Sequence, residues 1–198
     1  MSLAAKRGPG RPRNEATDAA ILAAAVAELS ERGFLAASME SIAARAGVAK
    51  TTVYRRWPSI DELTIAAIST FEQAQLEPPD GSVRDQLLWL LEGMRAKWTD
   101  PQYAAMMRRV AADGTTQPEI YRKSRDRVIG PVVRTMNAVL RRGIDEGVIR
   151  GGVELEWIRQ MLVSPIMAAT LTLKERVTRA QVELTLDTVL AGLAPSAE

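Results

Sequence analysis

The residues with the clearest chemical use lie close together between positions 50 and 56. They are three cations, two threonine hydroxyls and one phenol, with no acid among them: Lys50, Thr51, Thr52, Tyr54, Arg55 and Arg56. Cations bind phosphates, and hydroxyl and guanidinium groups can also bind the edges of bases. A short helix with this surface fits a groove of DNA, although a basic run on its own would be better explained as a solvated helix end.

Other chemistry is limited by two missing residue types. The chain of 198 residues contains no histidine and no cysteine. The usual zinc sites, Ser-His-Asp triads and disulfide bonds are therefore not available. No spacing of carboxylates or lysines suggests another catalytic site, and there is no glycine-rich loop of the kind that binds nucleotide phosphates. We therefore expect no enzymatic activity, no cofactor and no metal.

Two short helices joined by a tight turn must position the basic residues. Ser38 fits the N-cap of the first helix, because its hydroxyl can accept a free N–H of the first turn. Gly47 fits the end of that helix, where a left-handed residue is common. We expect the second helix to run from Lys50 to Arg56, because Pro58 prevents its continuation.

This segment resembles a known family. Residues 41–59 look like the helix-turn-helix of TetR-family transcriptional regulators: Ser-Ile-Ala-Ala-Arg-Ala-Gly-Val-Ala-Lys-Thr-Thr-Val-Tyr-Arg-Arg-Trp-Pro-Ser. The resemblance extends from about Ala19 to Ala67. One departure is Ala49, which stands where the family often has a serine that caps the recognition helix. The missing cap costs about 1 kcal/mol of local helix stability.

The resemblance implies roles for individual residues. Thr51, Thr52 and Arg55 would contact base edges, and Lys50 and Tyr54 would contact phosphates. Ser38, at the start of the preceding helix, would bind a phosphate through its hydroxyl and the free N–H groups there.

A basic arm precedes the first expected helix. Residues 6–13 read Lys-Arg-Gly-Pro-Gly-Arg-Pro-Arg, with four cations and no acid. The Gly-Arg-Pro core resembles the arms called AT-hooks, which lie in the minor groove, so Arg11 and Arg13 are candidate DNA contacts. A solubilising tail that touches phosphates at most is an equally good interpretation.

Charge separates the chain into parts. Residues 1–58 hold nine cations and five acids, a net charge of +4, and the remaining residues have a net charge of −2. This distribution favours a nucleic-acid-binding head on a larger body with another task. We expect a basic arm at 1–13, a DNA-binding domain at 14–58, and an effector-binding and dimerisation domain at 59–198. No apolar run is long enough to span a membrane, and we expect a cytoplasmic protein.

Apolar residues recur at helical spacing throughout, without the alternation of strands. The fold class is therefore all-α, with about nine helices. The expected helices cover residues 14–32, 38–46, 50–56, 59–75, 82–98, 101–113, 118–146 with an interruption at Gly130-Pro131, 154–173 with a kink at Pro165, and 179–193.

A ligand cavity is the first functional surface expected in the body. Tryptophan and methionine can line an adaptable apolar cavity, and the family resemblance implies an effector site. The candidate residues are Trp89, Met94, Trp98, Tyr103, Met106, Met107, Tyr121, Met136 and Met161. For each residue alone, plain core packing is the better interpretation. Arg95, Lys97 and Arg108 are expected to keep their charges in solvent.

A dimer interface is the second functional surface expected in the body. The last two helices carry more apolar width than one small body easily buries, and in the family such helices form a four-helix bundle across a two-fold axis. The expected interface residues are Leu155, Ile158, Leu162, Ile166, Val182, Leu186, Val189, Leu190 and Leu193. The alternative is that these residues complete the core of the monomer.

Together these features predict a homodimeric transcriptional regulator. We expect a repressor that a small, mainly apolar or aromatic effector releases from a pseudopalindromic site on double-stranded DNA. The competing hypothesis is a helical ligand- or partner-binding protein whose helix-turn-helix no longer reads DNA, and Ala49 is the one feature that favours it.

Overall fold

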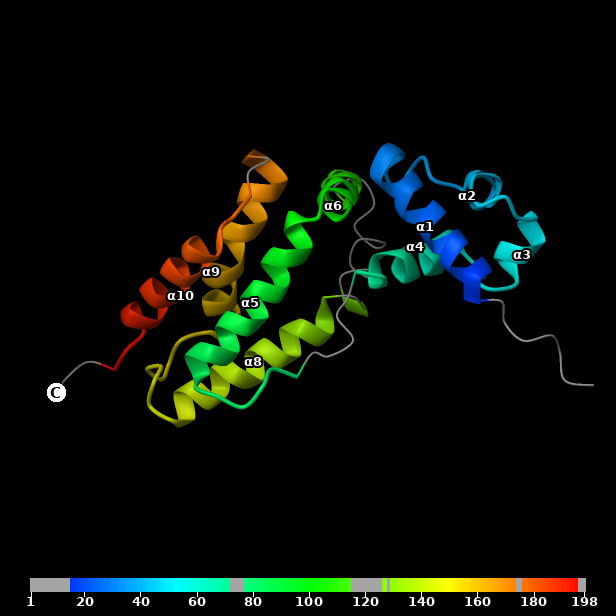
Figure 1. Ribbon diagram of the computed structural model, residues 1–198. Helices are drawn as coiled ribbons and strands as arrows, with labels where there is room; N and C mark the ends of the chain where they lie inside the picture. The colour runs from blue at the N-terminus through cyan, green and yellow to red at the C-terminus, as the bar shows by residue number, and fades with distance from the viewer. Residues whose placement is uncertain (1–14, 72–76, 115–125, 128, 174–175, 196–198) are drawn as a thin grey trace, which may run out of the picture.

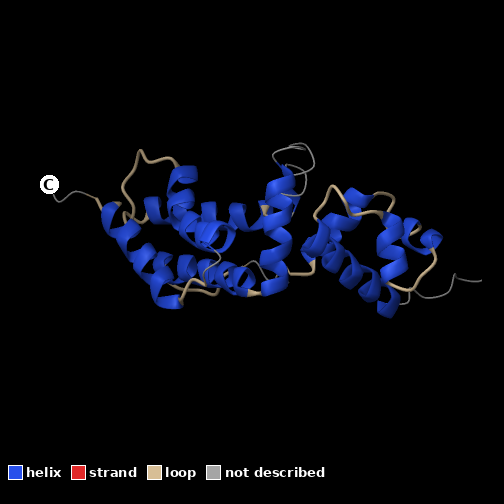
Figure 2. Ribbon diagram, turned by 90° about the horizontal axis from the view of Figure 1, so that it is seen from above, coloured by secondary structure: helices blue, strands red, loops and turns tan. Residues whose placement is uncertain are grey.

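The helices form two groups that lie side by side along the molecule (Figure 1). The computed structural model describes residues 15–71, 77–114, 126–127, 129–173 and 176–195. Within these residues there are nine α-helices, one π-helical segment and no strand (Figure 2). The arm with Arg11 and Arg13, and Tyr121, lie outside the described residues. The prediction of an all-α fold with about nine helices is confirmed.

The first group, here called the head, contains four helices. They are α1 (Glu15–Arg32), α2 (Met39–Arg45), α3 (Lys50–Tyr54) and α4 (Ile60–Ser69). The helix α1 ends at Gly33, whose φ of 80° favours glycine. The expected N-cap Ser38 is confirmed, since its hydroxyl accepts the Ser41 N–H in a capping box. Ser59 caps α4 by accepting the Glu62 N–H.

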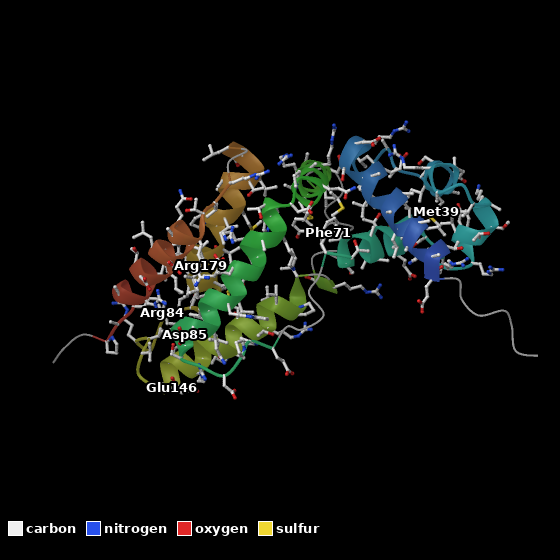
Figure 3. All side chains as sticks on the ribbon, in the orientation of Figure 1. Met39, Phe71, Arg84, Asp85, Glu146 and Arg179 are labelled. Carbon is white, nitrogen blue, oxygen red and sulfur yellow. The ribbon has the colours of Figure 1, made fainter. Side chains whose placement is uncertain are left out.

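The second group, here called the body, contains the remaining helices. They are α5 (Val83–Thr99), α6 (Pro101–Gly114), α8 (Gly130–Asp145), α9 (Leu155–Ala168), the π-helical segment η1 (Ala169–Leu173) and α10 (Arg179–Gly192). Asp100 starts α6, because its Oδ1 accepts the N–H groups of Gln102 and Tyr103. Arg84 of α5 binds Asp187 of α10 at 2.6 Å, where the two helices run together (Figure 3).

Prolines lie at or near both interruptions that the sequence predicted in the body helices. Pro131 lies in the first turn of α8, where its missing N–H costs nothing, so it starts a helix. Pro165 remains inside α9, and the helix changes to π-helical winding at Ala169. The expected single helix over 154–173 is therefore two elements. A π-helical turn inside a helix often accompanies a functional site.

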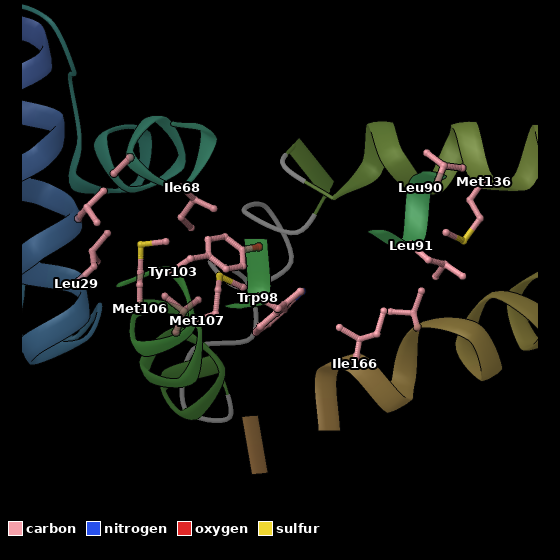
Figure 4. Close-up of a cluster of buried hydrophobic side chains, with 14 of the residues drawn as sticks. Leu29, Ile68, Leu90, Leu91, Trp98, Tyr103, Met106, Met107, Met136 and Ile166 are labelled. Carbon is pink, nitrogen blue, oxygen red and sulfur yellow. The ribbon is translucent and has the colours of Figure 1, made fainter. Parts of the chain in front are cut away.

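One hydrophobic core runs through head and body. It includes Leu29 and Ile68 on the head side, and Leu91 and Ile166 on the body side (Figure 4). The helix α6 lies between the two groups and packs extensively on α1. No helix within the described residues is long and apolar enough to cross a membrane.

Candidate DNA-binding surface and ligand cavity

Helix α3 presents most of the predicted DNA-binding residues on one exposed surface. Val53 is fully buried and anchors the helix on the head core, and Trp57 is half-buried against the same core. This anchor turns the opposite side of α3 outward. Four predicted residues are exposed there and a fifth is half-buried; they are Lys50, Thr51, Tyr54, Arg55 and Thr52.

Side-chain contacts hold α3 at its start. Ala49 provides no side-chain cap, as the sequence indicated. Lys50 forms an ion pair with Glu40 of α2 and lies 5.4 Å from the centre of the Tyr54 ring. The hydrogen bond from Lys50 lowers the pKa of Glu40, and the same bond raises the pKa of Lys50. The Lys50 charge is therefore partly engaged by the protein itself.

Arg56 is not part of the exposed surface. Its side chain is only 11% exposed, and its Nε donates to Asp18 of α1. Its Nη1 also lies 3.2 Å from the Thr52 backbone oxygen. The prediction that Arg56 faces DNA is corrected on this point, because the helix ends at Tyr54 and the next residues turn back toward α1. Arg56 instead fastens the end of α3 to α1.

A second ion-pair cluster fixes α2 on α1. Glu28 is buried, and its Oε1 lies 3.2 Å from Arg45 Nε. Arg45 Nη1 also donates to Glu31 Oε1 at 2.8 Å. Hydrogen bonding between the two side chains raises the pKa of Arg45 and lowers the pKa of Glu31. The two helices before and after the turn are thus both tied to α1.

Ser38 uses its hydroxyl within the head. Its Oγ accepts the Ser41 N–H at 3.1 Å, and its backbone N–H donates to Ser41 Oγ. The capping box leaves the other N–H groups in the first turn of α2 free, and these groups could still bind a phosphate as predicted.

The body encloses a cavity of about 400 Å³. Six of the nine predicted residues line it, from α5, α6 and α8: Trp89, Met94, Trp98, Tyr103, Met107 and Met136. Met106 does not line the cavity; it is fully buried and lies with Leu29 and Ile68 on the head side of α6 (Figure 4). Met161 is half-buried and also does not line it.

The polar residues of the cavity were missed by the sequence analysis. They are Lys97, Asp126, Glu156, Arg159 and Gln160. Lys97 lines the cavity rather than remaining in solvent as expected, whereas Arg95 binds Glu92 and Arg108 lies against the Thr170 backbone oxygen, both outside the lining. The available signal was helical spacing, since Arg159 precedes the cavity residues Val163 and Met167 by one and two turns.

Head and body meet at a hydrogen-bonded joint, here defined as residues 33–35 with Asp113 of α6. Asp113 Oδ2 accepts the backbone N–H of Phe34 at 2.6 Å and that of Leu35 at 3.2 Å. A Cβ on Gly33 would lie 2.6 Å from the same oxygen, so the close approach requires glycine. On the cavity side, the Tyr103 ring of α6 packs at a tilt against Phe71 after α4, with ring centres 5.1 Å apart, and edge-to-face against Trp98 at 5.2 Å.

The predicted dimer residues are mostly in the core of the single chain. Six of the nine are buried within it: Ile158, Leu162, Ile166, Val182, Leu186 and Leu193. They cannot gain further burial from a partner, so this part of the prediction is wrong. The other three, Leu155, Val189 and Leu190, are half-buried. The sequence showed that these helices are rich in apolar residues. It did not show that the other helices of the same chain bury most of them.

Other residues of the same helices, spaced along one side of each helix, are exposed and uncharged. We call this set the outer face: Trp157, Ser164, Pro165 and Ala168 of α9 with Ala180, Leu184, Thr188 and Ala191 of α10. Trp157 is 60% exposed and Leu184 is 67% exposed. The described residues contain no group of acids that could hold a metal ion.

Comparison with known proteins covers both groups of helices. Residues 21–67 match the model for bacterial regulatory proteins of the tetR family, and residues 77–189 match the tetracyclin repressor-like C-terminal domain. The chain is 30% identical over 165 residues to the DNA-binding transcriptional repressor TetR of Mycobacteroides abscessus, covering 81% of this chain and 82% of that protein. It is 27% identical over 157 residues to the HTH-type transcriptional regulator YdeS of Bacillus subtilis, covering 79% of each.

Solved structures share the fold. A TetR-family regulator from Pseudomonas syringae pv. tomato is 27% identical, with a TM-score of 0.65 over 90% of this chain and 95% of that chain. FadR from Bacillus subtilis, solved in complex with stearoyl-CoA, is 18% identical, with a TM-score of 0.70 over 89% of this chain and 99% of that chain.

Proposed function

The chain belongs to the TetR family of DNA-binding transcriptional regulators, and we propose that it is a homodimeric repressor that a small, mainly apolar or aromatic ligand releases from DNA. The family is one of regulators rather than enzymes. The observation that carries the proposal is the position of α6. One side of this helix lines the cavity with Tyr103 and Met107, and its end holds the head through Asp113.

DNA contacts are proposed from the exposed surface of α3. In this proposal Thr51, Thr52 and Arg55 read base edges, and Lys50 and Tyr54 contact phosphates, which their exposure supports. Lys50 must exchange Glu40 for a phosphate to make its contact. Arg56 fastens the residues after α3 to Asp18 of α1, so the helix that lacks a cap at Ala49 is held at its other end, which supports a head that can read DNA.

The dimer is proposed to form through the outer face with a second copy of this chain. Two exposed apolar side chains among small uncharged ones, on two helices that pack together, form a surface of the kind that marks protein interfaces. A two-fold axis there would pair each outer face with its own copy. Two α3 helices could then enter successive major grooves, about 34–36 Å apart, on a pseudopalindromic site.

Ligand release is proposed to act through α6. The cavity volume lies within the range of about 300–1,000 Å³ typical of small-molecule sites. A ligand against Tyr103 and Met107 would favour one position of α6, and Asp113 and Phe71 would pass that position to the head. The segment η1 also contacts α6, and there Arg108 Nη1 of α6 lies 3.4 Å from the Thr170 backbone oxygen.

A two-stage screen tests this function. Apolar and aromatic compounds are first tested for a rise in melting temperature, because a ligand that binds the folded state stabilises it. Compounds that raise it are then added to a gel-shift assay on DNA from upstream of the protein's own gene. The proposal requires that they release the DNA, and that the DNA weakens their binding by the same factor. Compounds that stabilise the protein without affecting DNA binding would contradict it.

A further inference from the structure

One cation in the cavity lining has a donor for which the described residues supply no acceptor. Arg159 of α9 lines the cavity, and its side chain is 18% exposed. Its Nη2 lies 3.1 Å from Oε1 of Glu156. Its Nε is buried, and no acceptor among the described residues reaches it. Folded proteins rarely leave a buried donor without an acceptor, so the Arg159 guanidinium, which belongs to a residue of the cavity lining, has hydrogen-bonding capacity left for a ligand.

The other charged groups of the lining restrict the charge of that ligand. Lys97 and Asp126 are each already engaged in an interaction of their own. The lining holds two cations, Lys97 and Arg159, and two acids, Asp126 and Glu156. A ligand with two or more negative charges would therefore face two carboxylates, whereas a single negative charge can be matched by Arg159 alone.

Glu156 is a weak competitor for the Arg159 guanidinium. Its side chain is 70% exposed, so it can turn into solvent without losing buried contacts. Nη2 would then be free for a ligand carboxylate, and a turn of the guanidinium would bring Nε to the same carboxylate, in the two-bond geometry that guanidinium and carboxylate groups favour. The rest of the cavity is largely apolar and aromatic, with Trp89, Met94 and Met107 among its residues.

We propose that the cavity binds an amphipathic monocarboxylate, with its carboxylate on Arg159 and its hydrocarbon or aromatic body against the tryptophan and methionine side chains. This inference rests on the proposed function, since it assigns a chemical class to the ligand of the same cavity. It adds a specificity-determining residue, Arg159, that the apolar character of the cavity does not require.

Matched probes separate the carboxylate from the apolar body. Decanoate is compared with 1-decanol, and 3-phenylpropionate with 3-phenylpropanol, by calorimetry and by quenching of tryptophan fluorescence. The proposal requires each acid to bind at least about 10-fold more tightly than its alcohol, the ratio that a charge-assisted hydrogen bond supports. Equal binding of acid and alcohol would overturn it while leaving the proposed function intact.

Two substitutions then have opposite expected effects. Arg159→Gln should weaken binding of the acids by about 10- to 100-fold and leave the alcohols unchanged. Glu156→Gln should tighten binding of the acids, because it removes the competing carboxylate from a position that is exposed and carries little folding energy. Arg95→Gln is the matched control, since Arg95 binds Glu92 outside the cavity lining and should leave both ligand sets unaffected.

The outcomes distinguish failure of the monocarboxylate proposal from failure of the proposed function. Tightening by Glu156→Gln supports the proposal even where Arg159→Gln does not fold, and unchanged acid affinity in Glu156→Gln and Arg159→Lys together overturns it. Binding of alcohols alone, with DNA release, overturns the carboxylate while keeping an apolar effector. Failure of all four probes to bind would overturn both the monocarboxylate and the cavity as an apolar ligand site.

Discussion

The head and the body hold their functional residues by different means. In the head, charged side chains tie the two short helices α2 and α3 to the long helix α1, as in Arg45 with Glu28 and Arg56 with Asp18. In the body, methionine and tryptophan side chains are prominent in the lining of a cavity. Directional contacts fix the geometry that base recognition needs, whereas flexible apolar side chains can adjust around a ligand. The joint at Asp113 is where these two kinds of packing meet.

The largest expected effect comes from the outer face of the body. Leu184→Glu should convert the dimer to a monomer and lower operator affinity by about 10²- to 10⁴-fold, because two linked heads gain effective concentration that one head lacks. Light scattering and anisotropy on operator DNA measure both quantities. Val148→Glu is the control, since Val148 is also an exposed apolar residue, at 41%, but lies outside the outer face. A dimer that survives Leu184→Glu would place the interface elsewhere.

Leu186→Glu gives the contrast between a surface and a core position. Leu186 is fully buried within one chain, so this substitution should unfold the body rather than dissociate the dimer. Circular dichroism should show loss of helix for Leu186→Glu and native helix content for Leu184→Glu.

The joint at Asp113 should carry the coupling between ligand binding in the body and DNA binding by the head. Asp113→Ala removes the acceptor for the Phe34 and Leu35 N–H groups. The ligand should still bind, but its effect on DNA affinity, typically about 5- to 150-fold in coupled systems, should fall toward none. Asp145→Ala, at an exposed position on α8, is the control. Full ligand-induced release from the Asp113→Ala protein would show that α6 communicates by another route.

Arg55 and Arg56 test the head with adjacent residues of one type. Arg55→Ala should relax sequence preference by about 1–3 kcal/mol and leave the melting temperature unchanged. Arg56→Ala should lower stability by about 1–3 kcal/mol, because it leaves Asp18 without its hydrogen-bonded cation. Thermal melts and competition with random DNA separate the two effects. Reversed results would mean that Arg56 turns outward on DNA.

The sequence alone predicted the positions of many residues in the head but of fewer residues in the body. The positions of Ser38, Gly47 and Val53 follow from local rules of capping and spacing, which depend on neighbours in the chain. Arg56 and Leu186 could not be placed in this way, because their environment is made by α1 and by the packing of α9 and α10. The same holds for Arg159, whose cavity position depends on helices distant in sequence.

A smaller effect is expected at Glu40. Glu40→Gln frees Lys50 from its ion pair, so binding to random DNA should strengthen a few-fold and its salt dependence should steepen by up to about one released counterion. Glu62→Gln is the control, because Glu62 is an exposed acid on another helix of the head, α4. An unchanged salt slope would indicate that Lys50 does not reach a phosphate.

The smallest effect concerns pH and the Arg84–Asp187 pair between α5 and α10. The hydrogen bond from Arg84 lowers the pKa of Asp187. The pair therefore stabilises the protein above the ordinary aspartate pKa, and this contribution is lost as pH falls through the lowered value. The stability difference between the natural protein and Asp187→Asn, measured by denaturant titration, should be present at neutral pH and vanish in acid.

The most direct measurement of the whole account is a footprint on DNA from upstream of the protein's own gene. Two α3 helices related by a two-fold axis predict a protected region with two inverted half-sites, one helical turn apart or a multiple of it. Arg55→Ala should weaken the protection relative to random DNA, and Arg56→Lys should retain it. Protection without inverted symmetry, or affinity equal to that for random DNA of the same length, would contradict the proposal that this protein reads DNA as a two-fold dimer.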